Sequence, residues 1–234
     1  MIKFMAFGDL HYDDVPDGDR RIDELLEHIQ MSNPDFVISL GDLCRPVPEN
    51  REAVINRLNS TGVSLYYVIG NHETDDCHLE KVMEFFSLEK SYYSFTYGDV
   101  TFLVLNSCYF RINGEEYPYH NKNYKENMAL YPMIPSVETE WLKNELDNQR
   151  NYVIFSHHSL VNSFRDRGVY NRNTVRELFQ GKNVLLCMNG HDHGDSFSVV
   201  NEIPYYTVNS SAYVWCGCQI MTSELLRKKY AHLN

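Results

Sequence analysis

The chain opens with an apolar run that ends in glycine and two metal-capable side chains: residues 2–11 read IKFMAFGDLH. The first six residues of this stretch have the length and composition of a buried β-strand, and Asp9 and His11 follow the glycine that ends it. The same pattern recurs in residues 36–42, FVISLGD, and in residues 65–72, LYYVIGNH. This repetition predicts an α/β fold in which strands alternate with helices.

Helical periodicity fills the segments between these strands. Residues 20–31 place apolar side chains at helical spacing and stop at Asn33-Pro34, and residues 49–58 repeat the pattern more weakly. Further along, residues 136–148 predict a helix with Ser136 as its N-cap. The first third of the chain is therefore interpreted as βαβαβ.

Antiparallel strands are predicted to join this arrangement in the second half. Residues 92–106 indicate a hairpin that turns at residues 97–99, and residues 196–208 indicate a second hairpin. Between them, residues 152–155 and 184–188 predict two more strands that lead into histidine-rich segments. A short helix is expected over residues 174–179, and residues 223–232 resemble an amphipathic helix.

Residues 108–135 have no clear period and are rich in Tyr, Asn and Pro. A structureless segment of this length is usually functional or disordered, so we interpret it as a pocket-lining loop inserted in a single domain of residues 1–234. Its tyrosines, which include Tyr117, Tyr119 and Tyr124, suit a lid over the core. Contact with a nucleotide base is the second interpretation.

Composition limits the classes of function. The chain of 234 residues is 43% hydrophobic and 23% charged, as in globular proteins, and no apolar stretch is long enough to cross a membrane. Its 21 Lys and Arg against 32 Asp and Glu give a net charge of −11, which argues against extended nucleic acid as a partner. The six cysteines are interpreted as reduced thiols, and no cleavable signal peptide is evident, so we expect a cytoplasmic protein.

Metal-capable side chains follow five strand candidates. They are Asp9, His11, Asp42, Asn71, His72, His157, His158, His191 and His193. In an α/β sheet, ligands bind at the carboxyl ends of strands, so these groups can converge although they are distant in sequence. Carboxylate, imidazole and amide donors together suit Mn, Fe, Zn or Ni. Two Asp, one Asn and four of these His make seven candidate ligands, which are too many for one open tetrahedral site. The sequence therefore predicts two divalent transition-metal ions that share a carboxylate.

The order of these blocks resembles the calcineurin-like metallophosphoesterase family. The blocks are Asp9-x-His11, Gly41-Asp42, Gly70-Asn71-His72, His157 and Gly190-His191-x-His193. The resemblance implies a four-layer α/β/β/α sandwich with two mixed β-sheets. It also implies an enzyme, a metal-dependent phosphoesterase that is either a phosphatase or a phosphodiesterase.

The resemblance implies two metal positions that share Asp42. The other ligands would be Asp9, His11 and His193 for one ion, and Asn71, His157 and His191 for the second. A hydroxide that bridges the two ions, of which manganese is one candidate, would attack the phosphorus.

The resemblance also implies roles for residues that face the substrate. Asn71 and His72 would contact the phosphate, and His72 would be the general acid that protonates the leaving oxygen. His157 aligns with the family's ligand position, which leaves its neighbour His158 for a substrate-side or supporting role. The residue after this pair is Ser159, whereas many relatives have proline there.

The substrate is expected to be a small phosphomonoester, phosphodiester or nucleotide, because the acidic chain has no basic track for a polynucleotide. Two alternatives from other classes are a catalytically idle metal-binding scaffold on the same fold and a metal hydrolase of a non-phosphate bond. Relatives that are idle would be expected to lose ligands or the Asn-His pair, and this chain keeps both. The sequence carries no signal of oligomeric state.

Overall fold

Three short parallel strands form the first sheet. In the computed structural model, which describes residues 2–120, 131–161, 167–212 and 221–222, β1 (Phe4–Phe7), β2 (Phe36–Ser39) and β3 (Ser64–Tyr67) pair in this order. A fourth strand, β12 (Met221–Thr222), pairs antiparallel with β1 and makes the sheet mixed. The three predicted strands are confirmed to within a few residues at each end.

The second sheet has six strands in the described part of the chain. They are β4 (Tyr93–Tyr97), β5 (Val100–Val104), β8 (Asn151–Ser156), β9 (Asn183–Asn189), β10 (Ser196–Val200) and β11 (Ile203–Thr207). Their order is β10-β11-β9-β8-β5-β4, with parallel pairing in the centre and an antiparallel hairpin at each edge. Both predicted hairpins are therefore confirmed, and this sheet is also mixed.

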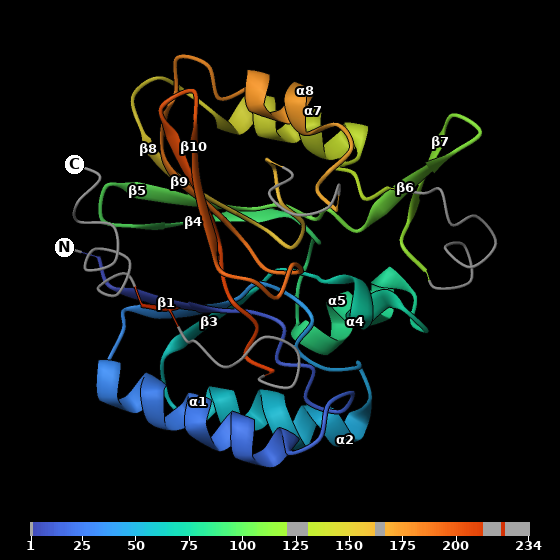
Figure 1. The fold of residues 1–234 in the computed structure, drawn as a ribbon, viewed down its shortest axis with the longest axis vertical. Helices are drawn as coiled ribbons and strands as arrows, with labels where there is room; N and C mark the ends of the chain where they lie inside the picture. The colour runs from blue at the N-terminus through green and yellow to red at the C-terminus, as the bar shows by residue number, and fades with distance from the viewer. Residues whose placement is uncertain (1, 121–130, 162–166, 213–220, 223–234) are drawn as a thin grey trace.

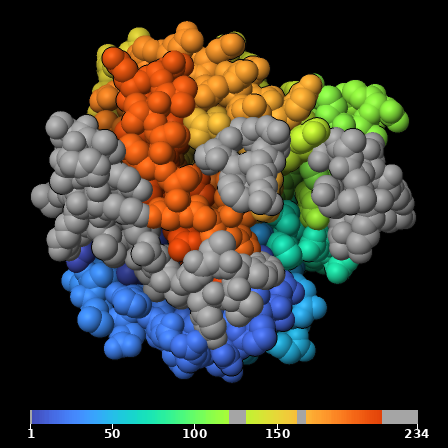
Figure 2. All heavy atoms as spheres, in the orientation of Figure 1, coloured from blue at the N-terminus to red at the C-terminus, as the bar shows by residue number. Residues whose placement is uncertain are grey.

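Helices cover the outer face of each sheet (Figure 1). Below the four-stranded sheet lie α1 (Gly18–Ser32) and a continuous helical run made of α2 (Pro48–Asn50), the π-helical η1 (Arg51–Asn56) and α3 (Arg57–Asn59). Above the six-stranded sheet lie α7 (Ser136–Glu145) and α8 (Arg172–Glu177). The space-filling view shows the same division, with the blue N-terminal part at the bottom and the yellow and orange part at the top (Figure 2). The predicted four-layer α/β/β/α sandwich is confirmed.

Alternation of apolar side chains along the strands produces three cores. In β1, Phe4 and Ala6 face the core between the sheets, whereas Met5 and Phe7 face the helices below. The core between the sheets is largely aromatic, with Phe36 and Phe102 ring centroids 4.9 Å apart. The third core lies between the six-stranded sheet and α7 with α8. Close packing of this kind holds the strand ends in fixed positions, which is what a ligand site at those ends requires.

Residues 108–135 were predicted to form a loop without regular structure, and this is wrong for residues 109–118. The strands β6 (Tyr109–Ile112) and β7 (Glu115–Pro118) form an antiparallel hairpin that projects beside α5 (Leu79–Phe86) (Figure 1). The hairpin turns at Asn113-Gly114, where both residues have positive φ (53° and 90°). This dipeptide is the preferred sequence of a two-residue turn.

The prediction of Ser136 as the N-cap of α7 is also wrong. Pro135 occupies that position, and Ser136 is the first helical residue. The Ser136 amide and hydroxyl both donate to the carboxylate of Glu116 in β7, at 2.7 and 2.6 Å. A carboxylate from another element thus takes the place of a local cap, because it accepts from the same exposed donor and complements the helix dipole.

Two further expectations concern residues outside the described ranges, namely Tyr124 and the helix over residues 223–232. Among the described residues, no helix combines the length and the apolar character that crossing a membrane would need.

Candidate metal centre

The predicted ligands follow five strands, and most of them lie in strained backbone. Asp9 and His11 follow β1, Asp42 follows β2, Asn71 begins α4 (Asn71–Thr74) after β3, His157 follows β8, and His191 and His193 follow β9. Left-handed φ values occur at Asp9 (55°), His11 (45°), Asp42 (55°), His191 (66°) and His193 (55°). Each such residue costs about 1–3 kcal/mol, and strain of this kind concentrates at functional sites.

The glycines of the blocks are required because other groups approach their backbone closely. A Cβ atom on Gly70 would lie 2.2 Å from Oδ1 of Asp42, and one on Gly190 would lie 2.7 Å from Oδ2 of Asp9. A side chain at either position would displace a predicted ligand.

One group of predicted ligands gathers Asp9, His11, Asp42 and His193, whose ligand atoms all lie within 4.8 Å of one another. His193 Nε2 is 3.3 Å from Asp9 Oδ1 and 3.2 Å from His11 Nε2. His11 Nε2 is 3.7 Å from Asp42 Oδ2. Two carboxylates and two imidazoles therefore face a common point, as the ligands of one metal position would.

The remaining predicted ligands surround His157. Its Nε2 atom is 3.1 Å from Asn71 Oδ1, 3.2 Å from His191 Nδ1 and 3.3 Å from Asp42 Oδ2. Its Nδ1 atom lies 2.8 Å from the Leu40 carbonyl oxygen, which orients the ring. The same Asp42 oxygen thus faces both groups, and the structure brings all seven predicted ligands together.

The donor set fits divalent cations. Asp9, His11, Asp42 and His157 are all at most 2% exposed, and burying carboxylates is costly unless positive charge accompanies them. Although burial alone would lower it, the charge of Asp42 and a hydrogen bond to it raise the pKa of His157 to about 9. The buried carboxylates therefore need positive charge close to them, and metal ions bound by neutral imidazoles would supply it.

Glu73, which sequence reasoning did not single out, holds the loop that carries Asp42. Its Oε2 atom accepts hydrogen bonds from the amides of Asp42 (3.0 Å) and Gly70 (2.8 Å), and its Oε1 atom accepts from Leu43 (2.5 Å). Burial and the nearby charge of Asp42 raise the pKa of Glu73 to about 7. Its place directly after the Asn-His pair is the signal that could have identified it.

His72 lies at the edge of the centre. Its amide donates to Asp42 Oδ1 at 2.9 Å, and its Nδ1 atom is 3.4 Å from carboxylate oxygens of both Asp14 and Asp75. Burial alone would lower the pKa of His72, but the hydrogen bond to Asp14 and the charges of Asp42 and Asp75 raise it to about 10. The side chain is 34% exposed, so the imidazole can be reached from solvent.

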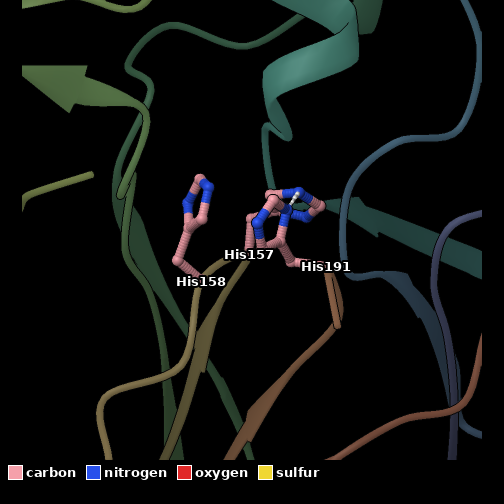
Figure 3. Close-up of side chains that lie close together, drawn as sticks. All are labelled: His157, His158 and His191. Atoms are coloured by element: carbon pink, nitrogen blue, oxygen red, sulfur yellow. Dashed lines mark hydrogen bonds between the residues drawn. The ribbon is translucent and has the colours of Figure 1, made fainter. Parts of the chain in front are cut away.

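His158 is buried behind the centre. Figure 3 shows its ring beside those of His157 and His191, and the ligand nitrogens of the three histidines lie within 4.8 Å of one another. Its Nδ1 atom is 2.8 Å from the Ser107 hydroxyl, and its ring centroid is 4.1 Å from that of His191. Burial and the charge of His157 hold the pKa of His158 well below its usual range. A neutral ring in this position favours the supporting role over direct contact with substrate.

Arg167 brings a positive charge to the centre. Its Nη2 and Nε atoms lie 3.0 and 3.3 Å from Nε2 of His191, and its Nε atom is 4.0 Å from Asp192 Oδ1. The side chain is 43% exposed. By contrast, Arg45, three residues beyond Asp42, forms an ion pair with Asp13 at 2.5 Å. No local pattern in the sequence distinguishes Arg167.

The fold, the five strand ends and the two groups of ligands define a metallophosphoesterase architecture. The model of the calcineurin-like phosphoesterase family matches residues 2–195, and the chain belongs to this family. This confirms the resemblance inferred from the sequence blocks.

Individual relatives are more distant. Human serine/threonine-protein phosphatase CPPED1 is 24% identical over 211 residues, which cover 80% of this chain and 60% of that protein. The chain therefore spans 60% of the length of this curated relative. A dimetal phosphatase from Danio rerio has a similar structure, with a TM-score of 0.71, 15% identity and coverage of 90% of this chain and 88% of that one. Phosphopantetheinyl hydrolase from Mycobacterium tuberculosis has a TM-score of 0.60 at 15% identity, with 92% of each chain covered. At these identities the two solved structures show the shared fold.

Proposed function

We propose that the protein is a phosphoesterase that uses two divalent transition-metal ions, Mn, Fe, Zn or Ni, to hydrolyse a small phosphate ester. The observation that carries the proposal is the position of Asp42, whose Oδ2 atom lies 3.7 Å from His11 and 3.3 Å from His157. One carboxylate oxygen between two groups of donors is the arrangement that a pair of ions needs. When bound, the ions would activate a water as the nucleophile and neutralise the phosphoryl oxygens.

Four side chains of the protein would transfer a proton, bind the phosphate or hold the metal ligands in place. His72, protonated and open to solvent, would give its proton to the departing oxygen. Arg167 would pair with a non-bridging phosphate oxygen from the side of His191. Glu73 would hold the amides of Asp42 and Gly70, so that the shared carboxylate keeps its direction. His158 would fix the orientation of the His191 ring.

Metal content and turnover test this proposal together. Protein reconstituted separately with Mn, Fe, Zn and Ni should bind about two ions per chain and hydrolyse p-nitrophenyl phosphate or bis-p-nitrophenyl phosphate. Asp42→Asn should lower the metal content measured by elemental analysis, because the shared ligand loses its charge, whereas Asp23→Asn on the exposed face of α1 should not.

Other outcomes would support the alternatives. Hydrolysis of an aryl acetate without hydrolysis of either phosphate ester would identify a hydrolase of another bond. Full metal content without turnover of any ester would favour the idle scaffold. Unchanged metal content in Asp42→Asn would contradict the shared ligand.

A further inference from the structure

A pocket lies between the end of the β6–β7 hairpin and the start of α5, and its lining begins at Cys77, two residues beyond Asp75. Its volume is about 370 Å³, within the range of small-molecule sites. The lining residues are Cys77, His78, Leu79, Glu80, Tyr117, Pro118, Tyr119 and His120. A larger hollow of about 670 Å³ is lined by residues at the start of β9, whereas His191 follows the other end of that strand. Of these two hollows, the pocket beside α5 is the one whose lining contacts residues at the edge of the metal centre, through Tyr119 and Asp75.

Two contacts connect the pocket to the proposed general acid. The Tyr119 hydroxyl donates to Asp75 Oδ1 at 2.7 Å, and Asp75 Oδ2 lies 3.4 Å from His72 Nδ1. The Tyr119 amide also donates to the Cys108 carbonyl oxygen at 2.8 Å, which fixes this side of the pocket to the hairpin. A general acid must lie next to the leaving oxygen, so the leaving group departs on the side of His72. The pocket therefore lies on the His72 side of the centre, where the rest of the leaving group would extend.

The lining indicates the chemistry of the group that it would accept. Four of its side chains are aromatic rings, and the centroids of His78 and His120 are 5.7 Å apart with their planes tilted by 33°. Flat rings bind flat rings by stacking. Among the described lining residues the only side chain of fixed charge is Glu80, which repels anions and can accept hydrogen bonds. An uncharged planar ring matches this surface, and Glu80 can also accept a hydrogen bond from a donor that the ring carries.

We propose that this pocket binds the leaving group of the substrate, and that the leaving group carries a planar, uncharged ring, as a nucleoside or a benzyl alcohol does. The inference rests on the proposed phosphoesterase function and adds a substrate class to it. It also gives the described part of residues 108–135 a role in substrate choice, because the end of the hairpin forms one wall of the pocket.

Matched pairs of substrates separate ring binding from leaving-group reactivity. Adenosine 5′-monophosphate and ribose 5-phosphate are both esters of a ribose 5-hydroxyl and differ in the base. Benzyl phosphate and cyclohexylmethyl phosphate differ in the planarity of the ring. We expect the KM of the planar member to be about tenfold lower in at least one pair, the size of effect that stacking one ring produces. A preference in the first pair alone identifies a nucleoside, and a preference in the second pair alone identifies a simple aryl group.

Variants of His78 and His120 test whether the preference for a planar ring arises in this pocket. In the double variant His78→Ala/His120→Ala, the KM values of the two members of a pair should lie within about twofold of each other. The control His28→Ala, at an exposed position on α1, should keep the wild-type ratio of the two KM values. His78→Ala alone, at an exposed position, serves if the double variant is unstable. Equal KM values in both pairs for the wild-type protein, or a preference that survives in the variants, would overturn the proposal.

A binding measurement separates failure of this inference from failure of the proposed function. Adenosine and benzyl alcohol contain no phosphate, so saturation-transfer NMR detects their binding whether or not any ester is hydrolysed. Binding that is lost in His78→Ala supports the pocket even if p-nitrophenyl phosphate is not turned over, which would refute the proposed function alone. If neither compound binds to a protein that hydrolyses p-nitrophenyl phosphate, the pocket assignment is wrong and the hydrolase remains.

Discussion

Single residues at the centre are expected to have separable kinetic roles. Arg167 approaches from the His191 side and is not among the predicted metal ligands, so its contribution should be to phosphate binding. His72 faces Asp14 and Asp75 on the other side, so its contribution should be to proton transfer. The two positions therefore predict different changes in KM and kcat.

Arg167→Ala should raise the KM for phosphate esters about tenfold or more and weaken inhibition by inorganic phosphate, because a charge-assisted hydrogen bond is lost. His72→Ala should lower kcat, and the loss should grow as the leaving group becomes more basic. Steady-state kinetics over a series of aryl phosphates, with metal content measured in parallel, distinguish the two. An equal loss across the series would refute the acid role of His72. An unchanged inhibition constant for phosphate would refute the role of Arg167.

At the scale of elements, the strands that have a local signal in the sequence could be predicted. The strands before Asp9, Asp42 and Asn71 could be predicted because short apolar runs and glycines are local signals. The hairpin in residues 109–118 was missed although Asn113-Gly114 is a strong turn signal, because the polar strands on either side lack a clear alternation of apolar residues.

Features that depend on distant partners could not be predicted in this way. The start of α7 is capped by Glu116, twenty residues earlier in the chain, and no local pattern at Ser136 reveals that partner. Arg167 likewise meets His191 across twenty-four residues. The candidate ligands were found because their residue types are restricted by metal chemistry, whereas an arginine is ordinary in almost any loop.

Glu138 in α7 is expected to make the stability of the protein depend on pH. Glu138 is fully buried, its Oε1 atom accepts from the Asn106 amide at 2.8 Å, and its Oε2 atom has no hydrogen-bond partner among the described residues. Burial raises the pKa of Glu138 well above its usual range, and the hydrogen bond from Asn106 lowers it only in part. The folded protein therefore keeps this proton at a pH where the unfolded chain has released it.

The difference in the pKa of Glu138 between the folded and unfolded states sets the direction in which the free energy of unfolding changes with pH. Below the unfolded pKa of about 4.3 both states are protonated, and above it the free energy of unfolding falls with rising pH by up to about 1.4 kcal/mol per pH unit until the folded pKa is reached. Glu138→Gln keeps an acceptor for Asn106 and cannot ionise. Chemical denaturation between pH 5 and 8 should show the variant gaining stability over the wild-type protein as pH rises, with Glu140→Gln on the same helix as an exposed control. A difference that does not vary with pH would show that Glu138 ionises normally in the folded state.

At the scale of the whole molecule, the sandwich concentrates negative charge and strained backbone at one edge. The net charge is −11, two of the carboxylates are buried at the centre, and five of the candidate ligands there have positive φ. The aromatic core between the sheets and the two helical layers must compensate for this local cost. Bound cations would remove part of it, so metal binding and folding should be thermodynamically linked.

Removal of metal should therefore destabilise the entire fold. At a free metal concentration about one hundred times the dissociation constant, binding adds about 2.7 kcal/mol to the free energy of unfolding. For a chain of this size that corresponds to a rise in Tm of roughly 5–10 °C. Calorimetry of the chelator-treated protein, before and after addition of Mn²⁺, measures the shift, and Mg²⁺, which prefers oxygen ligands, should produce a smaller one. In Asp42→Asn the Mn²⁺ shift should shrink, whereas in Asp23→Asn it should persist. A Tm that Mn²⁺, Fe²⁺, Zn²⁺ and Ni²⁺ all leave unchanged would mean that these seven side chains do not bind metal in the folded protein.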